Sequence, residues 1–283
     1  MAPAAEGLVL VDKPPGVTSH DVVDLVRRSL GTRKVGHAGT LDPMATGLLI
    51  LGVGRATRLL RYLGDLPKSY AGTGRLGEET DTLDADGAVV RRAPVDVSRA
   101  DVTRACAALI GESLQTPPAY SAVKVGGRKL YDAARSGDVL EAPPRPIRVD
   151  AFEVSGFDGR DVDVRITCSG GTYVRALVAD VGRALGCGAH LLRLRRTAIG
   201  PFRVEDARPP GEGEPLPLER AVAHLPSVRL DADEARAASH GRVLGPAGIE
   251  GPYAVFAPDG VLAGIYRDAG ASAHPEVVLA SDR

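Results

Sequence analysis

Residues 36–47 read GHAGTLDPMATG, and the rest of the chain is organised around this stretch. Its three glycines predict backbone that turns sharply or lies close to another segment. Pro43 disfavours helical backbone at Asp42, so we do not expect this carboxylate on a helix surface. The apolar run that follows, residues 47–53, reads as a short buried strand. The pattern would present the carboxylate of Asp42, with His37 nearby, on a stiff loop backed by a core strand.

An Asp-Pro pair among glycines also has a purely structural interpretation. Such pairs usually form turns in which the aspartate accepts hydrogen bonds from neighbouring backbone amides. On composition alone this interpretation is favoured over a catalytic one. The rest of the chain must therefore decide between them.

Length and composition describe an ordinary globular protein. The 283 residues can bury a sizeable core in one or two domains, and 44% apolar and 25% charged residues are typical of soluble proteins. No stretch approaches the ~20 apolar residues of a membrane span, and Met1 to Gly7 lacks the basic region of a signal peptide. Three cysteines without metal-ligand spacing fit a reducing compartment. We therefore expect a cytoplasmic protein.

The charge is divided unevenly along the chain. Residues 1–203 carry 28 Lys and Arg against 23 Asp and Glu, whereas residues 204–283 carry 7 against 13. A nucleic-acid surface would therefore belong mainly to the first two hundred residues.

Apolar periodicity predicts both strands and helices. Strands are expected at 8–11, 47–53, 68–76, 120–127, 147–154, 161–168 and 187–199. The strands at 147–154 and 161–168 are expected to form a hairpin with its turn at Asp158-Gly159. Helices are expected from Thr18 or Ser19 to residue 30, at 56–63, from Ser98 to about residue 110, and at 174–185. The Asp-rich turn 81–87 lacks the closing glutamate of a calcium loop, and strands flank it, so we expect no metal there.

Two basic features point towards an anionic partner. Residues 124–148 hold six basic and three acidic residues and end in a proline cluster around Arg145, which suits either a loop that closes on RNA or a solvated insertion. Arg175 falls in the first turn of a predicted helix, where the helix dipole disfavours a cation. A specific anionic partner for Arg175 would explain that position.

The C-terminal part differs in composition. Residues 207–227 begin with the linker-like sequence 207–217, rich in proline and glycine. Residues 228–283 contain short β-rich pieces. We expect a first domain at 1–206, a linker at 207–227 and a small β domain at 228–283.

Over roughly residues 7–200 the chain resembles the TruB family of tRNA pseudouridine-55 synthases. Seven segments match in order. They are Asp12-Lys13-Pro14 after the first strand, the 36–47 stretch, Lys68-Ser69-Tyr70, Asp81-Thr82-Leu83-Asp84, Tyr120-Ser121-Ala122-Val123-Lys124, Gly171-Thr172-Tyr173-Val174-Arg175, and residues 186–196.

The resemblance implies an α+β fold: a mixed, mostly antiparallel sheet with surrounding helices and a central cleft, followed by a small PUA-like domain. It implies that Asp42 is the nucleophile, that Tyr70 stacks on the target base and that Arg175 pairs with Asp42. His37, Tyr173 and Leu194 would line the nucleotide pocket. The implied partner is the T arm of tRNA, with no cofactor, no metal, no obligate protein partner and a monomeric enzyme.

The implied reaction is chemically coherent with these residues. The base must detach, turn and reattach inside a closed pocket, and a carboxylate can act covalently at uracil C6 or at ribose C1′. Burial would raise the pKa of the aspartate, and a guanidinium would oppose that rise. Two alternatives stay open: a guide-RNA-dependent synthase acting on ribosomal RNA, and a non-catalytic module that binds or folds tRNA.

Overall fold

The computed structural model describes residues 5–121, 123–131, 136, 140 and 142–279. Ala122 of the predicted strand at 120–127 lies outside these residues. Among the described residues of that segment, the strand is β8 (Lys124–Val125), paired with β9 (Arg128–Lys129). The glycine pair between them makes a tight turn, so the predicted strand is cut short.

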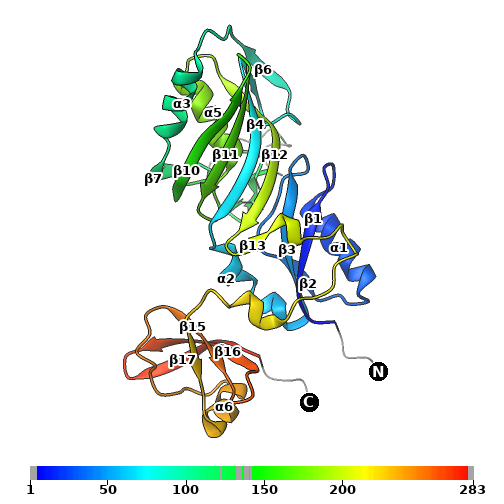
Figure 1. Cartoon of the computed structure of the whole chain (residues 1–283), viewed down its shortest axis with the longest axis vertical. Coiled ribbons are helices and arrows are strands. Elements are labelled where there is room, and N and C mark those ends of the chain that lie inside the picture. The colour runs from blue at the N-terminus through cyan, green and yellow to red at the C-terminus, as the bar shows by residue number, and fades with distance from the viewer. Residues whose placement is uncertain (1–4, 122, 132–135, 137–139, 141, 280–283) are drawn as a thin grey trace.

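One large sheet forms the framework of the first domain (Figure 1). All neighbouring pairs along it are antiparallel except β12 with β3, where Arg195 lies opposite Thr46. The predicted mixed, mostly antiparallel sheet is confirmed. In spatial order its strands are β1 (Gly7–Lys13), β3 (Thr46–Val53), β12 (Ala189–Ile199), β4 (Lys68–Leu76), β11 (Asp161–Cys168), β10 (Arg145–Phe157) and β7 (Gly111–Gln115), with β2 (Val35–His37) beside β3 and β13 (Phe202–Arg203) beside β12.

Helices cover the sheet on the sides that carry apolar residues. Thr18 caps α1 (Ser19–Ser29) and Ser98 caps α3 (Arg99–Ala107), so both predicted caps are confirmed, and each is part of a capping box. α3 ends at Ala107, before the predicted end near residue 110, because the edge strand β7 follows directly. α5 (Val174–Ala184) packs against β12. Its start fixes the position of Arg175.

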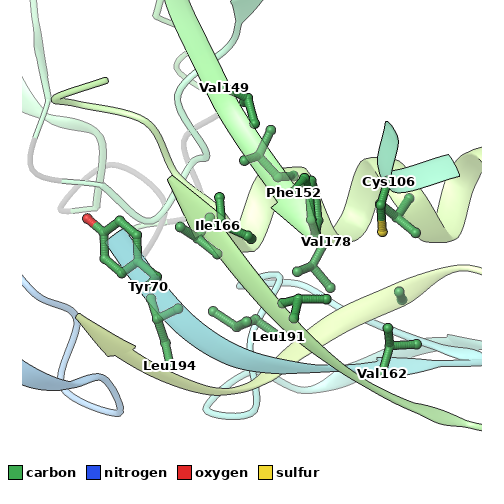
Figure 2. Close-up of a cluster of buried hydrophobic side chains, with 14 of the residues drawn as sticks. Tyr70, Cys106, Val149, Phe152, Val162, Ile166, Val178, Leu191 and Leu194 are labelled. Atoms are coloured by element: carbon green, nitrogen blue, oxygen red, sulfur yellow. The ribbon is translucent and has the colours of Figure 1, made fainter. Parts of the chain in front are cut away.

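The main hydrophobic cluster lies between this sheet and helices α3 and α5 (Figure 2). The alternating residues of β11 all point into it, which confirms the predicted face of that strand. Tyr70 and Leu194 lie side by side at one end of the cluster, and the phenol of Tyr70 points away from the other labelled side chains. The core therefore ends where the functional residues begin.

Shorter elements complete the first domain and its connections. Glu78–Thr80 (β5) and Val89–Arg92 (β6) flank the Asp-rich turn as a two-stranded ribbon. The remaining short elements are η1 (Gly54–Arg58), α2 (Leu60–Gly64), η2 (Val204–Asp206) and η3 (Leu218–Ala221). The segment predicted as a linker runs back along β1: Leu216 N donates to Leu8 O at 2.6 Å, and Arg208 N donates to Leu10 O at 3.1 Å. It is held against the first domain rather than free.

The small C-terminal domain is a four-stranded sheet with one helix, as expected. Its elements are β14 (Ser227–Arg229), α6 (Ala232–Ser239), β15 (Pro252–Phe256), β16 (Leu262–Ala269) and β17 (Ser272–Val278). One hydrophobic cluster contains residues of both domains, among them Leu63 and Val277. Arg55 Nη1 also donates to Leu279 O at 3.1 Å, and Tyr62 Oη to Glu276 at 2.8 Å.

Within the described part of the chain, no helix is long and apolar enough to cross a membrane. The three cysteines are free and buried.

Candidate active site

Asp42 lies in the loop between β2 and β3, close to the start of α1. The Ser19 hydroxyl at the first turn of that helix accepts from Leu41 N at 2.9 Å and donates to Leu41 O at 3.1 Å. Among the described residues, no backbone amide donates to the Asp42 carboxylate, so the structural interpretation of the Asp-Pro pair does not account for this side chain. Its side chain keeps 35% of its surface exposed.

Two buried cations hold the backbone on either side of Asp42. Lys13 Nζ donates to Pro43 O at 3.2 Å and to Val17 O at 2.7 Å. Arg196 donates to Thr40 O at 3.3 Å, and also to Gly39 O and Leu48 O. Buried charged groups need such partners, and each of these two cations finds at least one of them in the loop that carries Asp42. Sequence reasoning included both cations in matching segments but assigned them no role.

Arg175 lies behind Asp42, at the start of α5. Its Nε is 3.6 Å from Asp42 Oδ2, so the predicted pair is brought together. The same guanidinium makes a closer ion pair with Asp84, Nη1 to Oδ2 at 3.2 Å, and donates to the carbonyls of Thr82 and Tyr120. Arg175 therefore bridges two carboxylates, of which Asp84 is buried and Asp42 opens to the cavity.

Asp84 belongs to one of the matching segments, in the Asp-rich turn 81–87, but the sequence alone assigns it no role. Within this turn Thr82 Oγ1 donates to Asp84 Oδ1 at 2.6 Å, and Leu83 adopts a left-handed conformation with φ of 65°. That conformation is unusual for leucine, and it lets Thr82 O and Asp84 Oδ2 face Arg175 together. Among the described residues, no group of three or more His, Cys, Asp or Glu could hold a metal ion.

A cavity of about 250 Å³ opens in front of Asp42. Its wall includes five of the six predicted site residues: Asp42, Tyr70, Tyr173, Arg175 and Leu194. The other lining residues are Gly39, Thr40, Leu41, Lys68, Ser121, Arg145, Gly171, Thr172, Val174 and Arg196. Small-molecule pockets commonly span roughly 300–1,000 Å³, so this cavity lies just below that range and has room for a small ligand.

The sixth predicted residue, His37, is not brought into the wall. It belongs to β2, where it lies opposite Leu51 of β3, and the chain first reaches the cavity at Gly39. Its Nδ1 is buried and finds no hydrogen-bond partner in the described part of the chain. Pairing with β3 therefore keeps His37 in the sheet, outside this cavity.

The two tyrosines of the cavity are held in different ways. Tyr70 is 8% exposed and lies on β4, where its neighbours are those of the core cluster. Tyr173 precedes α5, and both its backbone N and O are bonded to the Gln115 side chain, at 2.8 and 3.1 Å. The guanidinium carbons of Arg145 and Arg175 lie 4.8 and 5.8 Å from the centre of the Tyr173 ring. Both aromatic rings are thus fixed before any ligand enters.

Burial dominates the proton affinities in this region. It raises the pKa of Asp42; Arg175 and, more weakly, Lys13 oppose that rise, whereas Asp84 adds to it. Burial also raises the pKa of Tyr70 and lowers that of Lys68 to about 8. The sequence predicts these opposing effects of burial and of the Arg175 guanidinium on the pKa of Asp42, and the effect of burial is the larger, so the pKa is raised.

Comparisons with known proteins cover nearly the whole chain. Residues 27–174 match the family model "TruB family pseudouridylate synthase (N terminal domain)", residues 175–208 match "tRNA pseudouridylate synthase B C-terminal domain", and residues 225–280 match "tRNA Pseudouridine synthase II, C terminal". The chain is 49% identical to a tRNA pseudouridine synthase B of Thermobifida fusca, over 98% of this chain and 99% of that protein. It is also 49% identical to one of Mycolicibacterium paratuberculosis, over 96% and 97%.

Solved structures agree with this. The fold is similar to a chain in the crystal structure of a Cbf5-Nop10-Gar1 complex, with a TM-score of 0.76 and 28% identity over 98% of this chain and 86% of that chain. An archaeal box H/ACA Nop10-Cbf5 complex contains a chain with a TM-score of 0.74 and 26% identity, over 99% and 88%.

Proposed function

The chain belongs to the TruB family of pseudouridylate synthases, and we propose that it isomerises uridine 55 in the T loop of tRNA to pseudouridine. Its activity is that of a tRNA pseudouridine synthase, an isomerase. The observation that carries the finer proposal is the position of Asp42, which faces the cavity with Arg175 at its back.

Asp42 is the proposed nucleophile. Isomerisation replaces the bond from ribose C1′ to N1 by a bond from C1′ to C5, and the proton lost from C5 is balanced by the one gained at N1. A carboxylate that attacks C6 or C1′ holds one fragment covalently while the base turns. Burial makes the anion reactive, and the Arg175 guanidinium favours its ionised form.

The other residues are proposed to bind the base. Uridine in a folded loop must be flipped out of its stack, at a cost of about a few kcal/mol. Stacking on Tyr70 would offset part of that cost, and Tyr173 and Leu194 would complete the wall around the base. For His37, which lies outside the cavity, we retain only a proposed contact with RNA beside the flipped nucleotide.

We propose that the chain works alone in the cytoplasm, as a monomer without an obligate protein partner. The near-complete overlap with synthases at 49% identity supports this over the guide-dependent alternative, because the similarity to the Cbf5 chains is 26–28%. Within the chain, residues 1–206 would form the catalytic domain, 207–227 the connecting segment and 228–283 a PUA-like domain. Turnover of a bare T-loop transcript by the purified chain would support independence, and a requirement for added proteins would contradict it.

The proposal is tested by Asp42→Asn on a T-arm transcript, with pseudouridine mapped along the RNA. We expect no product, while binding of the RNA is largely kept. Asp180→Asn is a matched control, because Asp180 lies on α5 and pairs with Arg183 at the surface. Product formation by Asp42→Asn would exclude Asp42 as the nucleophile, whereas wild type that binds the RNA but forms no product would favour the non-catalytic alternative.

A further inference from the structure

Arg145 has a fixed orientation at the edge of the cavity. It is the first residue of β10 and lies opposite Gln115 of β7, the residue that also holds the backbone of Tyr173. Its guanidinium lies over the Tyr173 ring, and its Nη2 donates to Gly171 O. Arg145 is therefore ordered by the same residues that build the cavity wall.

The hydrogen-bonding capacity of Arg145 is largely unused. Its Nε is buried and has no hydrogen-bond partner among the residues that the structure describes, although such groups in proteins are nearly always bonded. Of the other cations in the wall, Arg175 pairs with two carboxylates. Lys68 and Arg196 each donate to at least two backbone carbonyls. Arg145 donates to one and stays partly exposed.

The charge of the cavity indicates what the missing partner is. Four cations line the wall against the single carboxylate of Asp42, so the cavity attracts an anion. Stacking on Tyr173 uses the face of the Arg145 guanidinium and, with Nη2 bonded to Gly171 O, leaves the Nη1 end of the guanidinium for a ligand. Planar guanidinium groups bind phosphate oxygens through two parallel hydrogen bonds. An RNA nucleotide whose base enters the cavity brings its flanking phosphates to the rim.

We propose that Arg145 binds one of the two phosphates flanking the target uridine and thereby holds the flipped nucleotide in place. This assignment rests on the proposed function and deepens it. It gives Arg145 a role in binding, separate from the chemistry at Asp42.

The first test compares the dissociation constant of a T-arm RNA among variants. Arg145→Met should raise Kd about tenfold, as expected for one charged hydrogen-bonded contact, and should reduce the slope of log Kd against log salt by about 1. Arg145→Lys should recover part of the affinity, because it keeps the charge but not the fork. Arg148→Met is the control: Arg148 lies three residues along β10, pairs with Asp150 at the surface and should leave Kd unchanged.

The second test identifies the phosphate. A methylphosphonate in place of one phosphate flanking the target uridine should weaken binding by wild type about as much as Arg145→Met does, and should weaken the variant no further. Independent losses at both phosphates, or an unchanged Kd in Arg145→Met, would overturn the assignment. Kd needs no turnover, so wild-type protein that binds with this coupling but forms no pseudouridine would refute the proposed function and not the role of Arg145.

Discussion

Arg175→Met removes a guanidinium that lies between two carboxylates. The Arg175 side chain is 4% exposed, that of Asp84 is 5% exposed and that of Asp42 is 35% exposed. The variant leaves Asp84 as a buried charge without its cation, and leaves the carbonyls of Thr82 and Tyr120 without their donor. Breaking a buried pair in this way costs about 3–5 kcal/mol. We therefore expect the free energy of unfolding to fall by that amount, measured by urea titration at pH 7 with circular dichroism.

Double-mutant cycles show which carboxylate carries the loss. Arg175 and Asp84 are buried and 3.2 Å apart, so Asp84→Asn combined with Arg175→Met should give a coupling energy of roughly 1–3 kcal/mol. Asp42 is more distant, at 3.6 Å, and partly exposed, so its coupling with Arg175 should stay below about 1 kcal/mol. A coupling to Asp42 that equals or exceeds the coupling to Asp84 would refute the account of this network.

Three further outcomes are expected. Burial raises the pKa of Asp42, so the folded protein holds the carboxyl proton more tightly than the unfolded chain does, and the ionised carboxylate destabilises the fold at pH 7. Asp42→Asn should therefore melt at a higher temperature than wild type at pH 7, and the difference in melting temperature should shrink as the pH falls towards 3.8. A difference that grows on acidification would contradict this. Arg175→Lys should isomerise poorly in a pseudouridine assay, since a point charge does not replace the planar fork, and full activity would exclude the ion pair from the mechanism. Gly47→Ala should lose activity and at least about 1 kcal/mol of stability in urea titrations, because φ at Gly47 is 99° and the new Cβ would lie 2.3 Å from Arg196 O. Gly64→Ala is the control and should behave as wild type, because its new Cβ would have no described heavy atom within 4 Å.

The regular elements follow closely from local sequence. β11 has the predicted bounds 161–168 because its apolar residues alternate strictly, and β4 has the predicted bounds 68–76 although its small, polar sequence alternates only weakly. β7 was not predicted. It is an edge strand with three exposed residues in a row, so its sequence lacks the alternation of apolar and polar residues by which a half-buried strand is predicted.

The site was predictable where its residues lie in one short motif. The motifs and the resemblance assign roles to Asp42 and Arg175, whereas Lys13, Asp84 and Arg196 lie in matching segments without an assigned role, because their partners are distant in sequence. Lys13, for example, bonds a carbonyl 30 residues away. A usable signal was nevertheless present: Arg196 lies two residues after Leu194 on one strand, so both share the inward face, where an arginine is rare.

The interior that the two domains share changes how a truncation must be interpreted. Leu63 and Val277 belong to one hydrophobic cluster that also includes residues of β1, β15 and β16. Truncation near residue 225 would expose the apolar residues of that cluster to water, and the remaining fragment would be prone to aggregate. Loss of activity in such a fragment would thus reflect a disrupted hydrophobic core. Substitutions on the outer surface of the small C-terminal domain are needed to show whether that domain contacts nucleic acid.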